Sequence, residues 1–386
     1  MSAQRPSPRI AIVAGEPSGD ALAAPLVRAV RELRPDIEFV GIAGPQMQAA
    51  GVRALFPMER LAVMGLAEVA RHFLEILAIR RQLRDQLLRD PPALFIGVDA
   101  PDFNLGLEKA LRARGIRTMQ YVGPTVWAWR AGRIVKVKRA ADHVLVLFPF
   151  EPPIYERNGI PVTYVGHPLA DEIPMVPDRG TARAALGLPD AGPVVALLPG
   201  SRANELKYLG GVFAAAAALL RERLPGVRLL VPLVNGVTRE MFVAATTTHG
   251  GPEALGMLLL EGQAQRAMAA ADGVIATSGT ATLEAALHKR PLVITYRMSP
   301  FTWWLVKGKG YLPYVGMPNI LAEREVVPEY IQDAATPKNL VDGLLAQLHD
   351  PRRREDIERT FGDIHRRLRC DNARTAARAV LEMLQP

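Results

Sequence analysis

The sequence predicts an α/β protein made of two doubly wound domains, each built on a parallel sheet. Three observations carry this prediction: a length of 386 residues, an alternation of short β-branched runs with longer alanine- and leucine-rich stretches, and a proline-rich break near the middle of the chain. A chain of this length exceeds the usual size of one domain, and alternating strand and helix patterns are typical of parallel sheets. Hydrophobic residues make up 49% and charged residues 22% of the chain, which excludes a largely disordered protein.

The expected strands form two series. The first comprises residues 10–13, 38–42, 94–98 and 144–147, with a further strand ending just before Val122, and the second comprises residues 194–198, 228–232, 257–260, 273–276 and 292–296. Prolines interrupt the pattern between Pro161 and Pro189, so we expect one domain over residues 1–170 and another over 171–360. Residues 356–384 have helical spacing beyond the second sheet, and the pattern does not specify where they pack.

Composition narrows the classes of protein. Cys370 is the only cysteine, which excludes an intramolecular disulfide framework and a cysteine-rich metal site. No apolar run approaches the about 20 residues that span a bilayer, so we expect neither a membrane span nor a secreted precursor. The formal charge of +8 favours an anionic partner, and charge alone leaves nucleic acid, an anionic membrane surface and a phosphorylated substrate open.

The loops that follow the expected strands are the places to look for a ligand site. In open α/β sheets, ligands bind beyond the carboxyl ends of the strands, where helix N-termini present free N–H groups. After the first strand comes the glycine-bracketed turn from Gly15 to Asp20, which lacks the three spaced glycines of the dinucleotide fingerprint and therefore disfavours a nicotinamide cofactor. A tight turn in which Ser18 or Asp20 caps the next helix is an equally good interpretation.

Two loops of the second domain suit a diphosphate. Gly200, next to Ser201, lets the backbone approach a ligand closely, and Arg202 can bond phosphate oxygens bidentately. The segment from Ser278 through Gly279 and Thr280 opens a helix whose amides also suit phosphate, and Glu284 in that helix can accept bonds from ribose hydroxyls. A surface arginine and an ordinary helix cap remain the alternatives.

The first domain carries acids and aromatic residues after its strands. Asp99 and Asp102 flank a proline at a strand end, and Asp99, being nearer the strand, is the better candidate for a base that removes a proton from a hydroxyl. A helix-capping role for Asp102 is at least as good an interpretation. Trp127 and Arg130 belong to a run that also suits a sugar or lipid phosphate, although core packing explains its indoles equally well.

Residues 66–87 form an amphipathic, arginine-rich helical pattern. Its apolar positions recur at steps of three and four, which predicts either packing on the sheet or a surface that meets a lipid. No aspartate pair separated by one residue occurs, so the common acidic metal signature of sugar-nucleotide transferases is absent. We therefore expect no metal and no cofactor, with charge on a leaving group neutralised by Arg202 and helix ends.

Taken together, these segments resemble the lipid-A-disaccharide synthase family of bacterial glycosyltransferases, which have the GT-B fold of two Rossmann-like domains facing a cleft. The resemblance covers nearly the whole chain and rests on residues 14–20, 62–65, 99–104, 126–130, 198–202, 278–284 and 318–322. Pro17 and Thr125 stand where the family more usually has threonine and serine. Neither departure removes an obvious catalytic group.

The resemblance implies an inverting, metal-independent transfer of diacylglucosamine from UDP to 2,3-diacylglucosamine 1-phosphate (lipid X), giving the β-1,6-linked disaccharide 1-phosphate. It gives Asp99 and Arg202 essential roles and places Asn319 in the nucleotide site. It also implies a cytoplasmic enzyme on the inner-membrane surface, a possible homodimer and no nucleic-acid partner, with the last helix, about residues 360–386, packing back on the first domain or exchanging between subunits.

Two residue sets complete the expected site. The acceptor is expected to meet Ser18, Asp20, Asp102, Asn104, Trp127 and Arg130, and the membrane is expected to meet Val63, Met64, Leu66, Val69, Phe73, Leu74 and Leu77. Two rival functions remain: a UDP-sugar epimerase on the same fold, and a non-catalytic protein that binds lipid or nucleic acid by charge. The amphipathic helix argues against the epimerase, and the paired phosphate loops argue against simple binding by charge.

Overall fold

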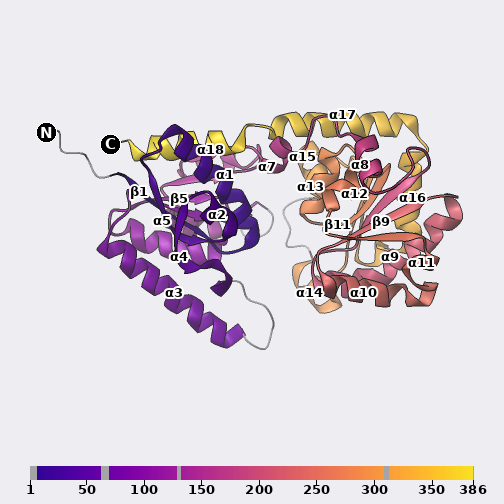
Figure 1. Ribbon diagram of the computed structural model, residues 1–386, viewed down its shortest axis with the longest axis horizontal. Coiled ribbons are helices and arrows are strands. Elements are labelled where there is room, and N and C mark those ends of the chain that lie inside the picture. Colours follow the sequence, from indigo (N-terminus) through magenta and orange to yellow (C-terminus); the bar gives the residue numbers. More distant parts are fainter. Residues whose placement is uncertain (1–6, 62–68, 128–131, 308–312, 386) are drawn as a thin grey trace. The chain divides into compact units, whose positions relative to one another are not determined.

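A computed structural model describes residues 7–61, 69–127, 132–307 and 313–385. The chain divides into two compact units, the first formed by Met1–Asp171 with Leu368–Pro386 and the second by Glu172–Arg367 (Figure 1). Each unit is a doubly wound α/β domain on its own parallel sheet. The predicted fold class is therefore confirmed.

The first unit has a seven-stranded parallel sheet in the order β3-β2-β1-β4-β5-β6-β7. Its strands are β1 (Arg9–Ala14), β2 (Glu38–Ala43), β3 (Val52–Pro57), β4 (Leu94–Val98), β5 (Arg117–Tyr121), β6 (His143–Val146) and β7 (Val162–Tyr164). Its helices are α1 (Pro17–Leu33), α2 (Pro45–Ala49), α3 (Val69–Arg89), α4 (Pro101–Arg112), α5 (Arg133–Ala140), α6 (Pro152–Glu156), α7 (Pro168–Glu172) and α18 (Asn372–Leu384). The chain runs outward from β1 to β3 and then returns to β4, so the strand order reverses between β1 and β4.

The second unit has a six-stranded parallel sheet in the order β10-β9-β8-β11-β12-β13. Its strands are β8 (Val194–Leu198), β9 (Arg228–Leu233), β10 (Met257–Glu261), β11 (Gly273–Thr277), β12 (Leu292–Tyr296) and β13 (Glu329–Ile331). Its helices are α8 (Arg179–Ala185), α9 (Ala203–Arg223), α10 (Gly236–Thr246), α11 (Gly251–Ala254), α12 (Ala264–Ala270), α13 (Thr280–Leu287), α14 (Pro300–Val306), α15 (Met317–Ala322), α16 (Pro337–Leu348) and α17 (Pro351–Leu368). Here the strand order reverses between β8 and β11.

The central strands are buried on both faces. Strands β1, β4, β8 and β11 are almost entirely inaccessible, which explains their continuous apolar runs. The edge strands β3, β7 and β13 are only partly buried, and their sequences carry no comparable run. The fourth edge strand, β10, is also only partly buried, yet it was predicted as residues 257–260. Sequence patterning therefore found the middle of each sheet and β10, and it missed the other three edges.

The C-terminal residues form two helices rather than one continuous pattern. Helix α17 ends at Leu368, Asp371 adopts a left-handed conformation with φ of +51°, and α18 then packs against α1 in the first unit (Figure 1). The side chain of Asn372 donates to the carbonyl of Gly166 at 2.9 Å and accepts from the Tyr121 hydroxyl at 2.6 Å. These buried bonds hold the start of α18 on the first sheet.

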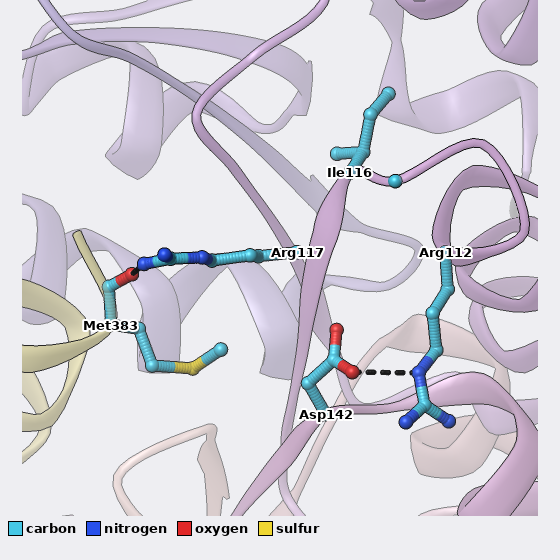
Figure 2. Close-up of a pocket in the computed structure, with 6 residues that line it drawn as sticks. Arg112, Ile116, Arg117, Asp142 and Met383 are labelled. Atoms are coloured by element: carbon cyan, nitrogen blue, oxygen red, sulfur yellow. Dashed lines mark hydrogen bonds and ion pairs between the residues drawn. The ribbon is translucent and has the colours of Figure 1, made fainter. Parts of the chain in front are cut away.

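A cavity of about 490 Å³ lies at the amino-terminal edge of the first sheet, where β5 begins (Figure 2). Its charged groups already have partners: Arg112 pairs with Asp142 at 2.6 Å, and Arg117 donates to the carbonyls of Met383 and Gln385. The cavity therefore belongs to the contact by which Arg117 holds the end of α18 on the first sheet. It lies at the edge of the sheet opposite to the loops that follow the strands.

Among the residues that the structure describes, no helix is both long enough and apolar enough to cross a bilayer.

Candidate active site

In the second unit, two predicted phosphate loops follow neighbouring strands. Leu198, the last residue of β8, pairs with Ala276 of β11, so the loops after these strands emerge side by side at one edge of the sheet. This edge is also the point where the strand order reverses. Such switch points are where doubly wound sheets bind ligands, because the flanking helices depart to opposite faces and leave a crevice.

The loop after β8 is built around Gly200. This residue has φ of +125°, and a Cβ atom added there would lie 2.5 Å from the Cβ of Glu205, so only glycine fits. The buried Glu205 carboxylate accepts the N–H groups of Ser201 and Arg202 at 2.8 and 3.2 Å. The fold of the loop therefore depends on an acid in the first turn of α9.

Arg202 projects from this loop toward solvent. Its side chain is 80% exposed and is joined to Glu205 by a single 3.2 Å contact, so most of its donors are free to bind an incoming phosphate. The sequence prediction did not include Glu205. Glu205 lies three residues after Arg202, the residue that precedes α9. An acid at this position indicates a capping box, and this signal was available in the sequence.

The loop after β11 presents a second helix start. Gly279 has φ of +156°, and the space beside its Cα is open, with no atom within 4 Å of an added Cβ. The hydroxyl of Ser278 donates to the carbonyl of Val315 at 3.1 Å, which fixes the loop against the segment before α15. The free amides at the start of α13 are therefore held beside open space, where they can bind an anion.

Glu284 lies in the second turn of α13 and is half-buried. Burial, with a smaller contribution from Glu172, raises the pKa of the Glu284 carboxyl to about 7. Hydroxyl groups that donate to a carboxylate favour its ionised form. A ribose bound at Glu284 would therefore lower this pKa, as expected of the role predicted from the sequence.

Asn319 is fully buried in α15, and its amide is used within the protein. The Asn319 nitrogen donates to Val327 and Glu329, and its oxygen accepts from the backbone of Val326 and Val327, all at 2.8–3.1 Å. These four bonds fill its hydrogen-bonding capacity. Because Glu329 also accepts the N–H groups of Val315 and Gly316, Asn319 supports the segment that contacts Ser278. Its predicted place in the nucleotide site stays a prediction.

In the first unit, Asp99 lies at the corresponding switch point. Ala14 at the end of β1 pairs with Val98 at the end of β4, so the turn at Gly15 and the Asp99 loop are neighbours. Asp99 and Ala100 have φ of +49° and +41°, a conformation that is strained for residues other than glycine and asparagine or aspartate. Burial raises the pKa of Asp99 above its usual value, as suits a general base.

Two side-chain amides hold the left-handed backbone of Asp99. The Asp99 carbonyl accepts from the side-chain amides of Asn104 at 2.9 Å and Gln120 at 3.0 Å. Asn104 is fully buried and positions the Asp99 backbone, and its predicted contact with the acceptor stays a prediction. Gln120 was not predicted, because its pairing with Gly97 across β4 and β5 is a tertiary contact.

Glu108 completes this group one turn below Asn104. Its two carboxyl oxygens are buried and have no hydrogen-bond partner within the described residues, and neither do the oxygens of Asn104 and Gln120. Burial, with a smaller effect of Asp142, raises the pKa of Glu108 to about 8, so it is mostly a neutral acid at pH 7. An added Cβ on Gly97 would lie 2.4 Å from Glu108, which explains the glycine at this position in β4.

Asp99 lines a cavity of about 390 Å³. The lining residues are Gly15, Glu16, Leu61, Ile76, Leu77, Arg80, Asp99, Ala100, Pro101, Asp102 and Phe103. The cavity thus combines a base candidate with an apolar wall from α3. Glu16 and Arg80 were not predicted, although Glu16 lies in the glycine-bracketed turn that the sequence had singled out.

Ser18 and Asp20, two further residues predicted to meet the acceptor, do not line the Asp99 cavity. Ser18 is exposed at the start of α1, whereas Asp20 is buried and accepts the N–H groups of Gln46 and Met47, both at 2.9 Å. Neither caps α1, because the residue before that helix is Glu16 and it makes no capping bond. The Asp20 carboxylate instead caps α2, and its predicted contact with an acceptor stays a prediction.

The indole N–H of Trp127 is also used in a hydrogen bond within the protein. Its indole N–H donates to the buried Glu151 at 3.3 Å, and its ring packs edge-on against Phe150 with centroids 5.1 Å apart. Asp102 is 90% exposed and pairs with Arg133 at 3.1 Å. Arg130 lies outside the described residues.

The amphipathic pattern over residues 66–87, which includes part of the predicted membrane patch, divides along α3. Leu74 is 68% exposed and Leu77 lines the Asp99 cavity, whereas Leu83 and Leu87 are buried in the core. The second half of the amphipathic pattern is therefore a packing face, and the first half is where a lipid could be met. Val63, Met64 and Leu66 lie outside the described residues, as do the side chains of Val69 and Phe73.

Two doubly wound domains, each on a parallel sheet, are the architecture of the GT-B fold. The fold is similar to that of UDP-GlcNAc 2-epimerase from Neisseria meningitidis, with a TM-score of 0.65, 12% identity and coverage of 97% of this chain and 99% of that one. It is also similar to CalG4, the calicheamicin glycosyltransferase, with a TM-score of 0.60, 15% identity and coverage of 98% of both chains. At these identities, the similarity shows the fold alone.

Sequence comparison identifies the family. The chain is 50% identical over 382 residues to lipid-A-disaccharide synthase of Burkholderia thailandensis, covering 98% of both chains. It is 52% identical over 375 residues to lipid-A-disaccharide synthase of Chromobacterium violaceum, covering 97% of both. Residues 10–380 match the model of the lipid-A-disaccharide synthetase family. The chain belongs to this family, and it is a glycosyltransferase of lipid A biosynthesis.

Proposed function

We propose that the enzyme transfers 2,3-diacylglucosamine from UDP to the 6-hydroxyl of 2,3-diacylglucosamine 1-phosphate. The product is the β-1,6-linked disaccharide 1-phosphate, and UDP leaves. The observation that carries the proposal is the pair of anion-suited loops, at Gly200–Arg202 and Ser278–Thr280, on neighbouring strands of the second sheet. Two proteins of similar fold were solved with UDP-GlcNAc and with UDP and glucose, which supports a UDP-sugar donor.

The proposed chemistry is one displacement that inverts the anomeric carbon. The acceptor hydroxyl oxygen forms a bond to C1 of the donor, the bond from C1 to the phosphate oxygen breaks, and its electron pair leaves with UDP. The hydroxyl proton passes to the Asp99 carboxylate, whose raised pKa improves it as a base. Arg202 and the first amides of α13 stabilise the charge that develops on the diphosphate, and Glu284 binds the ribose.

The test of this function is incubation of the purified protein with UDP-2,3-diacylglucosamine and 2,3-diacylglucosamine 1-phosphate. We expect UDP and disaccharide to form in equal amounts, with a β linkage, only when both substrates are present. We expect a chelator to leave the rate unchanged. Release of UDP at a rate independent of the acceptor would refute the transferase function. A loss of activity on adding a chelator that Mg²⁺ restores would refute the metal-free mechanism.

We further propose that the first half of α3, where Leu74 is exposed, contacts the inner-membrane surface, where both lipid substrates reside. Because Leu74 is 68% exposed, Leu74→Ser is expected to weaken binding to anionic vesicles by about threefold to tenfold without destabilising the fold. Flotation with vesicles measures the effect, and adding Leu77→Ser is expected to enlarge it.

The matched control is Leu33→Ser, which alters a leucine that is 49% exposed at the end of α1. It is expected to float like the wild type. Equal flotation of all variants would show that α3 does not contact the vesicle.

A further inference from the structure

Helices α4 and α5 pack side by side in the first unit (Figure 1). A third cavity of this unit, of about 710 Å³, is lined by residues of these two helices. We call it the basic cavity. Its lining residues are Pro101, Asp102, Leu105, Gly106, Lys109, Gly132, Arg133, Lys136 and Arg139. Four of these side chains are cations and one is a carboxylate. The cavity therefore concentrates positive charge in a concave surface.

The cations are arranged along one face of α5. Arg133, Lys136 and Arg139 recur every three residues, which places them one above another on the side that lines the cavity, and Lys109 faces them from α4. Arg133 has Asp102 as a partner at 3.1 Å. Within the described part of the chain, the other three make no ion pair. Like charges on successive turns repel, and a bound anion would relieve that repulsion.

The basic cavity adjoins the Asp99 cavity. Pro101 and Asp102 line both, so the first turn of α4 forms a shared wall. On one side of this wall lie Asp99 and the apolar residues of α3, and on the other side lie the four cations. The acceptor of the proposed reaction carries a hydroxyl, acyl chains and an anionic group, and the two adjoining cavities offer a chemically suited set of residues for each.

We propose that the basic cavity binds the phosphate monoester of the acceptor lipid while its hydroxyl lies at Asp99. This inference rests on the proposed function, because it assigns the anionic end of the same acceptor. A phosphate monoester carries nearly two negative charges at pH 7 and offers three oxygens, so it suits several cations better than a carboxylate does. Arginine and lysine are the residues that commonly bind such groups.

The test measures coupling between these cations and the acceptor phosphate. In neutral detergent micelles, Lys136→Ala/Arg139→Ala is expected to raise the KM for 2,3-diacylglucosamine 1-phosphate by about 10²-fold, since each charge-assisted contact is worth roughly tenfold. The donor KM is expected to stay unchanged. Both side chains are exposed, so the variant should fold normally. With the acceptor that lacks its phosphate, wild type and variant should give the same rate.

Lys138→Ala is the matched control, because Lys138 lies on α5 but does not line the cavity. It is expected to leave the acceptor KM unchanged. An equal loss of rate with both acceptors, or a variant whose acceptor KM equals that of the wild type, would overturn the phosphate site. Weaker binding of the double variant to phosphatidylglycerol vesicles, with an unchanged acceptor KM, would assign the cavity to membrane headgroups instead. If the wild type forms no disaccharide at all, the proposed function itself fails.

Discussion

Replacing Asp99 by asparagine is expected to lower kcat by about 10³-fold, within the usual contribution of a general base. Asparagine has nearly the same shape as aspartate but cannot accept the acceptor's proton at neutral pH. It also tolerates the left-handed backbone, which Asp99 adopts with φ of +49°, so the bonds from Asn104 and Gln120 should persist. Steady-state rates of UDP release measure the loss, and thermal unfolding checks that the fold is retained.

The pH profile supplies a second readout for Asp99. Burial raises its pKa, and a base works only in its deprotonated form, so activity is expected to fall as the pH drops through this raised value. The acid limb of kcat/KM should therefore lie above the pH range of an ordinary aspartate, and it should be absent from the residual rate of Asp99→Asn. A variant that keeps the wild-type kcat and the wild-type acid limb would remove Asp99 from the chemistry.

Arg202→Ala is expected to lower the donor kcat/KM by about 10²- to 10³-fold, because the guanidinium would no longer neutralise the leaving diphosphate. Stability should change little, since the side chain is 80% exposed and the backbone N–H of Arg202 keeps its bond to Glu205. Arg202→Lys should recover only part of the loss, because lysine restores the charge without the paired donors. Donor kinetics and UDP titration calorimetry give the measurement.

The control for Arg202 is Arg223→Ala, at the other end of α9, where the guanidinium pairs with Asp342. It is expected to leave donor kinetics intact. If Arg202→Ala binds UDP and turns over donor like the wild type, the diphosphate must be held elsewhere, and the anion-suited loops of the second sheet would lose their assigned role.

The sequence revealed the elements whose signals are local. The central strands are continuous apolar runs because they are buried on both faces, and the ligand loops combine glycines, hydroxyls and single charges directly after those runs. Gly200, Gly279 and Arg202 were found in this way. Since doubly wound sheets bind ligands at the strand ends, knowing where the strands end was enough to place these loops.

What only the tertiary structure decided is how each polar side chain is used. Asn319, Asp20 and Asn104 have the chemistry of ligand-binding residues, yet each makes hydrogen bonds inside the protein that its own sequence position does not announce. Burial favours such bonds, because a buried polar group without a partner is costly. The partly buried edge strands and the packing of α18 on α1 likewise depend on contacts between distant segments. Local patterns thus determined the fold class and the candidate loops, whereas burial and the hydrogen bonds formed on folding decided which polar side chains are already paired within the protein and which remain exposed.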